Sequence, residues 1–322
     1  AALITMLMVS AGLFLTVGFS GEPTGGHSSC TKPDTLSERL EFANLPQEQE
    51  VLRRADPWAR QLSDFDMGVR QLTTEPTDLR EFLDFASSNA VAWTTEERVA
   101  WQLVNEKLSA ATAGLNIDLP HIRLVRTSGH EEFNAAYTRG RAINMGPFEA
   151  ALAVDAPDIA FFLLAHELFH VLSREDTKLR DDMHALLGFT RIHNFEYPAE
   201  LEERRLSNPD SFDYGAALTV QTGTGNADVV PIFQMRVPLE EAIQLPDVFA
   251  ALGIDLVAVD VSTGDAVRDG NGEVVLYGFD NTNWIPLMAR NTDFIIQPQE
   301  VMADNFALLM QRRADGVLPA TI

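Results

Sequence analysis

One helix-length segment combines an almost continuous apolar run with polar groups that the same run would bury. Residues 157–174 read PDIAFFLLAHELFHVLSR. Residues 159–165 are apolar on every side of a helix, so we expect this helix to lie inside the protein. His166, Glu167 and His170 then need partners, because an unpartnered buried polar group costs several kcal/mol.

The spacing of these polar residues indicates a metal site. Side chains at positions i and i+4 lie on one face of a helix, with their Cβ atoms about 5–6 Å apart. The imidazoles of His166 and His170 can therefore bind one zinc ion at about 2.0–2.1 Å. Glu167, next to the first histidine, is placed to accept a proton from the attacking water. The segment is an HExxH motif, written here as HELFH.

The motif and the residues before it resemble the zincin metallopeptidases. In that family an edge strand ahead of the HExxH helix pairs with an extended peptide substrate. The segment NAAYTRGRAINM, residues 134–145, is similar to that strand, and its residues 135–145 read as a hairpin. The resemblance implies an α+β zincin-like fold, a bound Zn²⁺, peptide-bond hydrolysis and a substrate strand that contains Tyr137 and Arg139.

A catalytic zinc ion needs a third protein ligand and an open position for water. Glu300 lies in the predicted helix over residues 298–313, and Asp304 follows one turn later. This pair is similar to the second zinc helix of the gluzincins, where a Glu binds the metal and an Asp fixes the tautomer of a ligand histidine. The resemblance implies Glu300 as the third ligand and Asp304 as the residue that orients a histidine.

Two alternatives to Glu300 stay open from the sequence alone. In the longer metzincin pattern HExxHxxGxxH, Ser173 stands at the glycine and Asp176 at the last ligand position. That pattern needs the helix to break at the glycine, and Ser173 does not force a break. The other alternative is a group of three residues further along the chain, namely His193, Glu196 and Glu200.

A hydrolase of this kind also needs a hydrogen-bond donor for the oxyanion of the transition state. The chain has four tyrosines. Tyr214 lies in the turn-rich segment NPDSFDYG, which is suited to line a cleft, and we predict that it is the donor. Tyr137 and Arg139 on the expected substrate strand are the other candidates.

The remaining sequence predicts a scaffold for this centre. Residues 34–114 have helical periodicity and are interpreted as a helical scaffold. Residues 115–206 contain short strands and the HExxH helix and form the expected zincin core. Residues 207–290 are rich in Gly, Asn, Asp and Pro with short β-like runs, which predicts a β-rich insertion between the two zinc helices. Residues 291–322 contain the helix of Glu300.

The first 33 residues form a separate segment. Residues 1–19 carry no charge and are about as long as a membrane span, roughly 20 residues. A stretch rich in Gly, Pro and Ser follows, so we interpret residues 1–33 as a signal peptide or N-terminal anchor with a linker. We therefore expect an exported protein, either periplasmic, secreted or attached to a membrane. Cys30 is interpreted as a free thiol rather than a lipid attachment site.

Charge and cysteine content limit the function further. The chain has 24 Lys and Arg against 47 Asp and Glu, a formal net charge of −23, which argues against a nucleic-acid partner. A single cysteine excludes a zinc site built from cysteines, so a metal centre must use histidine and carboxylate. We expect a zinc-dependent metallopeptidase that acts on a peptide or protein. The alternatives are a catalytically silent zinc protein and an envelope interaction protein.

Overall fold

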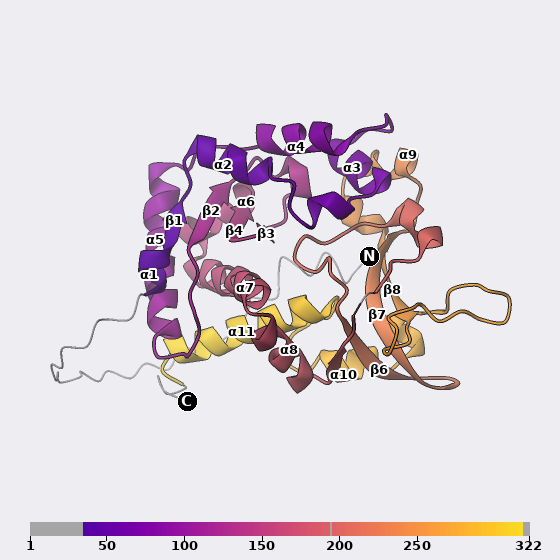
Figure 1. Ribbon diagram of the computed structural model, residues 1–322. Coiled ribbons are helices and arrows are strands. Elements are labelled where there is room, and N and C mark those ends of the chain that lie inside the picture. The colour runs from indigo at the N-terminus through magenta and orange to yellow at the C-terminus, as the bar shows by residue number, and fades with distance from the viewer. Residues whose placement is uncertain (1–34, 194, 318–322) are drawn as a thin grey trace.

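The structure is a computed structural model that describes residues 35–193 and 195–317. Helices surround two separate β-sheets, so the predicted α+β class is confirmed (Figure 1). The segment expected to be a signal or anchor, with Cys30, lies outside the described residues. Among the residues that are described, no helix has both the length and the apolar character needed to cross a bilayer.

The first sheet has four strands in the order β1–β2–β4–β3. Strands β1 (Leu40–Phe42), β2 (Ile122–Arg126) and β4 (Ala142–Met145) run parallel to one another. Strand β3 (Tyr137–Arg139) is antiparallel to β4 and forms one of the two edges of the sheet. The sequence predicts a hairpin over residues 135–145, and the β3–β4 pair confirms it.

Strand β1 is a difference from the sequence prediction, which places only helices in residues 34–114. Leu40 pairs with Ile122 in parallel register, so the strand exists only because a distant segment lies beside it. A pattern of three residues does not reveal a distant partner, so this strand cannot be predicted from local periodicity. The other elements of this stretch are the helices α1 (Leu36–Arg39), α2 (Leu45–Leu52), α3 (Asp64–Gln71), α4 (Leu79–Ser88) and α5 (Thr95–Thr112).

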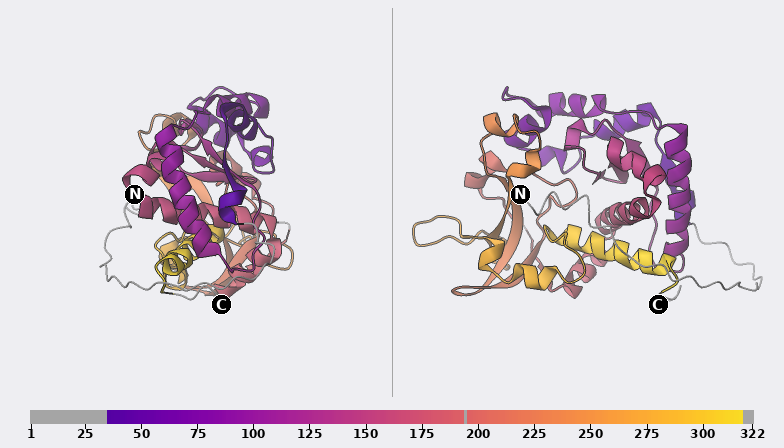
Figure 2. Two further views of the ribbon diagram at one scale, coloured as in Figure 1. Left: turned by 90° about the vertical axis from the view of Figure 1, so that its left-hand side faces the viewer. Right: turned by 180° about the vertical axis from the view of Figure 1, so that it is seen from behind.

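Four helices share the largest apolar cluster of the described chain with residues of the first sheet. They are α5, α6 (Pro147–Asp155), α7 (Pro157–Glu175) and α11 (Pro298–Ala314). Trp101 of α5, Phe169 of α7 and Phe306 of α11 are members of that cluster. Helix α7 is buried along most of its length, as its apolar sequence predicts, and α8 (Thr177–Leu186) follows it directly. Figure 2 shows α11 crossing the molecule beneath α7.

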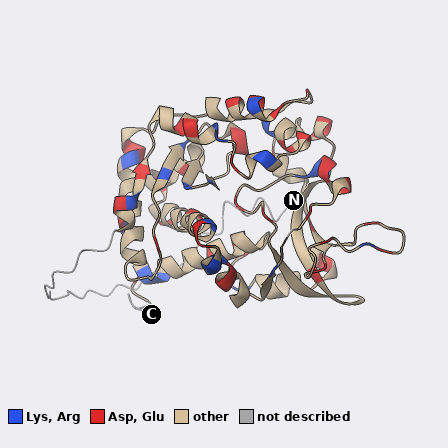
Figure 3. Ribbon diagram, in the orientation of Figure 1, with Lys and Arg blue, Asp and Glu red and all other residues tan. Residues whose placement is uncertain are grey.

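The second sheet has five antiparallel strands in sequence order. They are β5 (Phe189–Arg191), β6 (Ala216–Thr222), β7 (Gly225–Met235), β8 (Leu252–Ala258) and β9 (Leu276–Tyr277). Four of these strands fall within residues 207–290, where the sequence predicts β-structure. The short helices α9 (Leu239–Ala242) and α10 (Trp284–Met288) flank the sheet. Figure 3 shows acidic residues spread over both the helical and the β-rich regions.

A buried ion network fixes α3 to the loops beside the first sheet. The guanidinium of Arg70 donates to both carboxylate oxygens of Glu132, at 2.7 and 2.6 Å. It also donates to Asp66 at 3.0 Å and to the carbonyl of Ser207 at 2.8 Å. Arg70 and Asp66 are fully buried, so each charge depends on the others for its compensation.

We predict that Arg70→Ala lowers the free energy of unfolding by about 3–5 kcal/mol, because it leaves the buried Glu132 without its counter-charge and removes one of the two arginines that pair with Asp66. Urea denaturation followed by tryptophan fluorescence measures the change. The matched control is Arg80→Ala, whose side chain is 89% exposed in its ion pair with Asp84. Equal losses in the two variants would contradict the importance of the network.

Candidate metal centre

Helices α7 and α11 lie side by side and carry the predicted ligand residues on facing sides (Figure 1). The Nε2 atoms of His166 and His170 are 3.0 Å apart. The Oε2 atom of Glu300 lies 3.2 Å from Nε2 of His166 and 3.4 Å from Nε2 of His170. The structure therefore brings the two histidines of the HExxH motif together with Glu300. This glutamate follows His166 by 134 residues in the sequence.

The three distances fit a tetrahedral metal. Ligand atoms about 2.0–2.1 Å from a tetrahedral ion lie about 3.3 Å from one another. The observed separations of 3.0, 3.2 and 3.4 Å scatter around that value. Two imidazole nitrogens and one carboxylate oxygen are also a donor set that zinc accepts. The residues present thus fit the ion that the sequence predicts.

Neighbouring side chains orient two of these ligands. Asp304 Oδ1 lies 2.8 Å from Nδ1 of His166, and the other oxygen of Asp304 accepts from the hydroxyl of Thr292. A proton held on Nδ1 leaves the lone pair of Nε2 free for a metal. Asn208 donates to Glu300 Oε1 at 2.6 Å, which turns Oε2 toward the histidines.

The charges of the cluster favour a cation. Burial lowers the pKa of His166, but its hydrogen bonds to Asp304 and Glu300 outweigh burial and raise that pKa well above its usual value. Burial raises the pKa of Glu300, but the charge of His170 and the hydrogen bonds from both histidines lower it overall. Two carboxylates thus face the ring nitrogens of the histidines, and a divalent ion can compete with protons for these nitrogens.

Glu167 lies beside the cluster, and its pKa shifts in the opposite direction from that of Glu300. Its Oε2 atom is buried and has no hydrogen-bond partner among the described residues. Burial, followed by the charge of Asp210, raises the pKa of Glu167 well above its usual value. Ligand atoms of Glu167, His170 and Asp210 lie within 4.8 Å of one another. The sequence gives no sign of Asp210 or Asn208 beyond the turn-rich character of their segment.

The structure places the alternative third ligands elsewhere. Helix α7 continues unbroken through Ser173 to Glu175, and Asp176 caps α8 by accepting from the backbone N–H of Leu179 at 2.9 Å. The second alternative is the group of His193, Glu196 and Glu200. All three side chains are exposed, and Glu200 pairs with Arg268 at 2.5 Å. Within residues 35–193 and 195–317, neither alternative joins a group with metal-ligand spacing.

The predicted substrate-strand residues have internal roles. Tyr137 donates from its hydroxyl to Glu131 at 3.2 Å. Arg139 donates to Asp56 at 2.7 Å and to the carbonyl of Leu52 at 2.8 Å. Both side chains are buried although β3 is an edge strand, so neither of them faces an open groove.

Tyr214, the predicted oxyanion donor, packs in a different apolar cluster from α7 and α11. Its ring lies 5.6 Å from that of Phe195 and 5.5 Å from that of Tyr197. Its buried hydroxyl has no hydrogen-bond partner in the described part of the chain. The backbone of Tyr214 is left-handed, with φ +44°, which is uncommon for a bulky residue.

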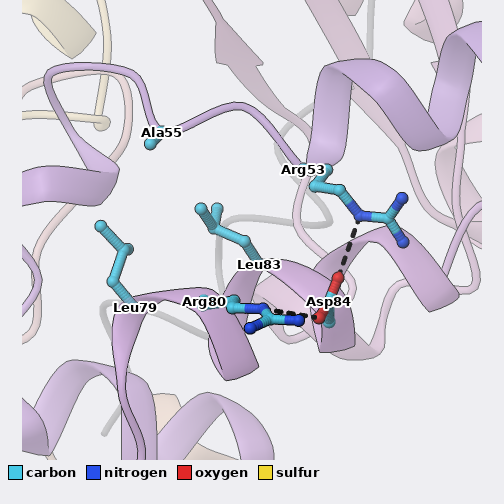
Figure 4. Close-up of a pocket in the computed structure, with 6 residues that line it drawn as sticks. All are labelled: Arg53, Ala55, Leu79, Arg80, Leu83 and Asp84. Atoms are coloured by element: carbon cyan, nitrogen blue, oxygen red, sulfur yellow. Dashed lines mark ion pairs between the residues drawn. The ribbon is translucent and has the colours of Figure 1, made fainter.

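A surface pocket of the molecule is separate from this centre. Figure 4 shows it between the end of α2 and α4, where Arg53 and Arg80 both pair with Asp84, at 3.0 and 4.0 Å. None of its lining residues belongs to α7 or α11.

Comparisons with protein-family models, with curated proteins and with solved structures give no match to this chain.

Two further buried carboxyl groups, Glu149 and Glu131, have raised pKa values, and Glu149 is the one that acts on Glu167. Burial raises the pKa of Glu131 to about 7 and that of Glu149 to about 7. One oxygen of each has no hydrogen-bond partner among the described residues. Glu149 adds to the raised pKa of Glu167, and Glu131 adds to that of Glu149.

We predict that Asp304→Ala weakens zinc binding about 10–100-fold, because His166 loses the partner that fixes its tautomer. Competition with a chromophoric chelator measures the affinity. Asp293→Asn removes one charge from an exposed position near the same helix and serves as the control, with an affinity close to wild type. An unchanged affinity in Asp304→Ala would remove this aspartate from the centre.

The buried carboxyl of Glu149 predicts a pH dependence of stability. Its pKa of about 7 in the folded protein is higher than in the unfolded chain, so protonation of Glu149 stabilises the folded state. This contribution is complete below about pH 4.5 and is lost as the pH rises through 7. In metal-free protein, Glu149→Gln should reduce the fall in stability between pH 5 and pH 8 by about 2 kcal/mol. Urea denaturation at both pH values measures it, and an unchanged fall would contradict the raised pKa.

Proposed function

We propose that the protein is a zinc-dependent hydrolase, specifically a metallopeptidase of zincin type with a gluzincin-like ligand set. One observation carries the proposal: His166 Nε2, His170 Nε2 and Glu300 Oε2 lie 3.0–3.4 Å apart, at the spacing of ligands on a tetrahedral ion. The HExxH pattern and the Asp304–His166 contact agree with it.

Each residue of the centre has a role in this proposal. His166, His170 and Glu300 would hold the ion, and Asp304 keeps the Nδ1 proton of His166 in place. A bound Zn²⁺ would supply Lewis acidity, which lowers the pKa of water and polarises a carbonyl group. Glu167 accepts the proton of the attacking water and passes it to the leaving amine.

The substrate and the place of action belong to the same proposal. An uncharged segment at residues 1–19 supports export to the periplasm, the cell exterior or a membrane surface. The substrate is then a peptide or protein outside the cytoplasm. A net charge of −23 weighs against nucleic acid as the substrate.

A catalytically silent zinc protein is the second candidate. It is favoured by Asp210, whose carboxylate lies within 4.8 Å of the ligand atoms of Glu167 and His170. Four protein ligands are typical of structural zinc sites, whereas catalytic sites keep one position for water. The two candidates differ in whether one position on the ion stays open for water.

We predict that Glu167→Gln keeps one zinc ion per chain and lowers peptide hydrolysis at least about 100-fold, because the general base is lost while the ligands remain. Zinc content is measured by atomic absorption, and cleavage of a mixed peptide library by mass spectrometry after long incubation. Hydrolysis at the wild-type rate in this variant would overturn the mechanism.

A further inference from the structure

The two oxygens of the Glu300 carboxylate have different partners. Oε2 lies 3.2 Å from Nε2 of His166 and 3.4 Å from Nε2 of His170. Oε1 accepts from the side-chain amide of Asn208, at 2.6 Å, and has no other hydrogen bond among the described residues. Glu300 is 4% exposed, so this amide takes the place that water would take on an exposed carboxylate.

Two backbone groups fix which way the amide of Asn208 points. The N–H of Asp210 can only donate, and it lies 2.9 Å from Oδ1 of Asn208. The carbonyl of Ser211 can only accept, so Gln297 turns its Nε2 toward that carbonyl, at 3.4 Å. The Oε1 atom of Gln297 then faces Nδ2 of Asn208, at 2.9 Å. Nδ2 has two hydrogens, one for Gln297 and one for Glu300, so Asn208 is a donor to the carboxylate.

A donor at Oε1 decides how Glu300 can bind an ion. A carboxylate can bind a metal through one oxygen or through both. While Oε1 accepts from Asn208, only Oε2 is available, and together with the two imidazoles it makes three ligand atoms. Catalytic zinc sites have three protein ligands and keep the next position for water. The donor is a neutral amide, so it adds no positive charge that would repel the ion.

We propose that Asn208 holds Glu300 as a one-oxygen ligand, and thereby keeps one position of the metal open for water. This inference rests on the proposed function. Asn208 acts through Glu300, so it is a positioning residue and not a catalytic one. Without its amide, the buried Oε1 loses its hydrogen bond and turns to the ion, and Glu300 then binds through both oxygens.

The test loads the full-length chain with Co²⁺, which accepts the same ligands as zinc and absorbs visible light. Four-coordinate Co²⁺ absorbs much more strongly than five-coordinate Co²⁺, so the spectrum reports the number of ligands. Wild type should have a strong, four-coordinate spectrum. We expect Asn208→Ala to keep one Co²⁺ per chain and to lose at least about half of the molar absorbance, because the second oxygen of Glu300 makes the ion five-coordinate.

A second variant separates the donor from the packing of the side chain. Asn208→Asp keeps the size of the side chain and an acceptor for the N–H of Asp210, but it has no donor for Glu300. It should show the same loss of absorbance, and it serves in place of Asn208→Ala if that variant does not fold. Wild-type absorbance in the folded variants would overturn the proposal. Loss of Co²⁺ from them would also overturn it, since Asn208 would then be needed for binding itself.

Ser211→Ala is the matched control, because it removes a hydrogen bond between the same loop and the same helix. The hydroxyl of Ser211 donates to Gln299 at 2.5 Å, next to Glu300 in the sequence but not to it. Its spectrum should equal that of wild type, and an equal loss of absorbance would contradict a specific role of Asn208. A weak, five-coordinate spectrum in wild type would overturn the proposal and leave the proposed function standing. Wild type that binds no Co²⁺ would refute the proposed function as well.

Discussion

The centre depends on the packing of α7 against α11. Each helix carries two of the four polar residues, and neither pair can bind a metal alone. The apolar contact between the helices includes the rings of Phe169 and Phe306, whose centroids are 5.7 Å apart. Buried aromatic packing of this kind tolerates little displacement. A shift of one ångström would move Glu300 Oε2 out of the range that a tetrahedral ion accepts.

The rest of the fold supports that contact from two sides. The first sheet and α5 pack on α7, while Asp66 of α3 accepts from Ser207 and Gln299 of α11 accepts from Ser211. Arg70 is central to this support, since it binds Glu132, Asp66 and the carbonyl of Ser207 together. Buried charges are a costly way to build a core. Here they place Asn208 and Asp210 beside the centre, where an apolar core would place no donor or acceptor.

Local features of the sequence predict much of this arrangement. His166 and His170 share a helical face because their spacing is four residues, and the same holds for Glu300 and Asp304. The hairpin before α7 and the β-rich stretch also follow from local patterns. The family resemblance is the only basis on which the sequence predicts that these two helices lie side by side. Strand β1, Asn208 and Asp210 escape prediction, because a three-residue strand and a loop side chain owe their positions to distant partners.

We propose that α7 and α11 together form one zinc site with nitrogen and oxygen ligands. X-ray absorption at the zinc edge of the zinc-loaded chain measures the ligand set. We expect four light-atom ligands near 2.0–2.1 Å, with the multiple-scattering signal of two imidazoles and no sulfur contribution. Zinc that dialyses away, or a spectrum with fewer than two imidazoles, would contradict it.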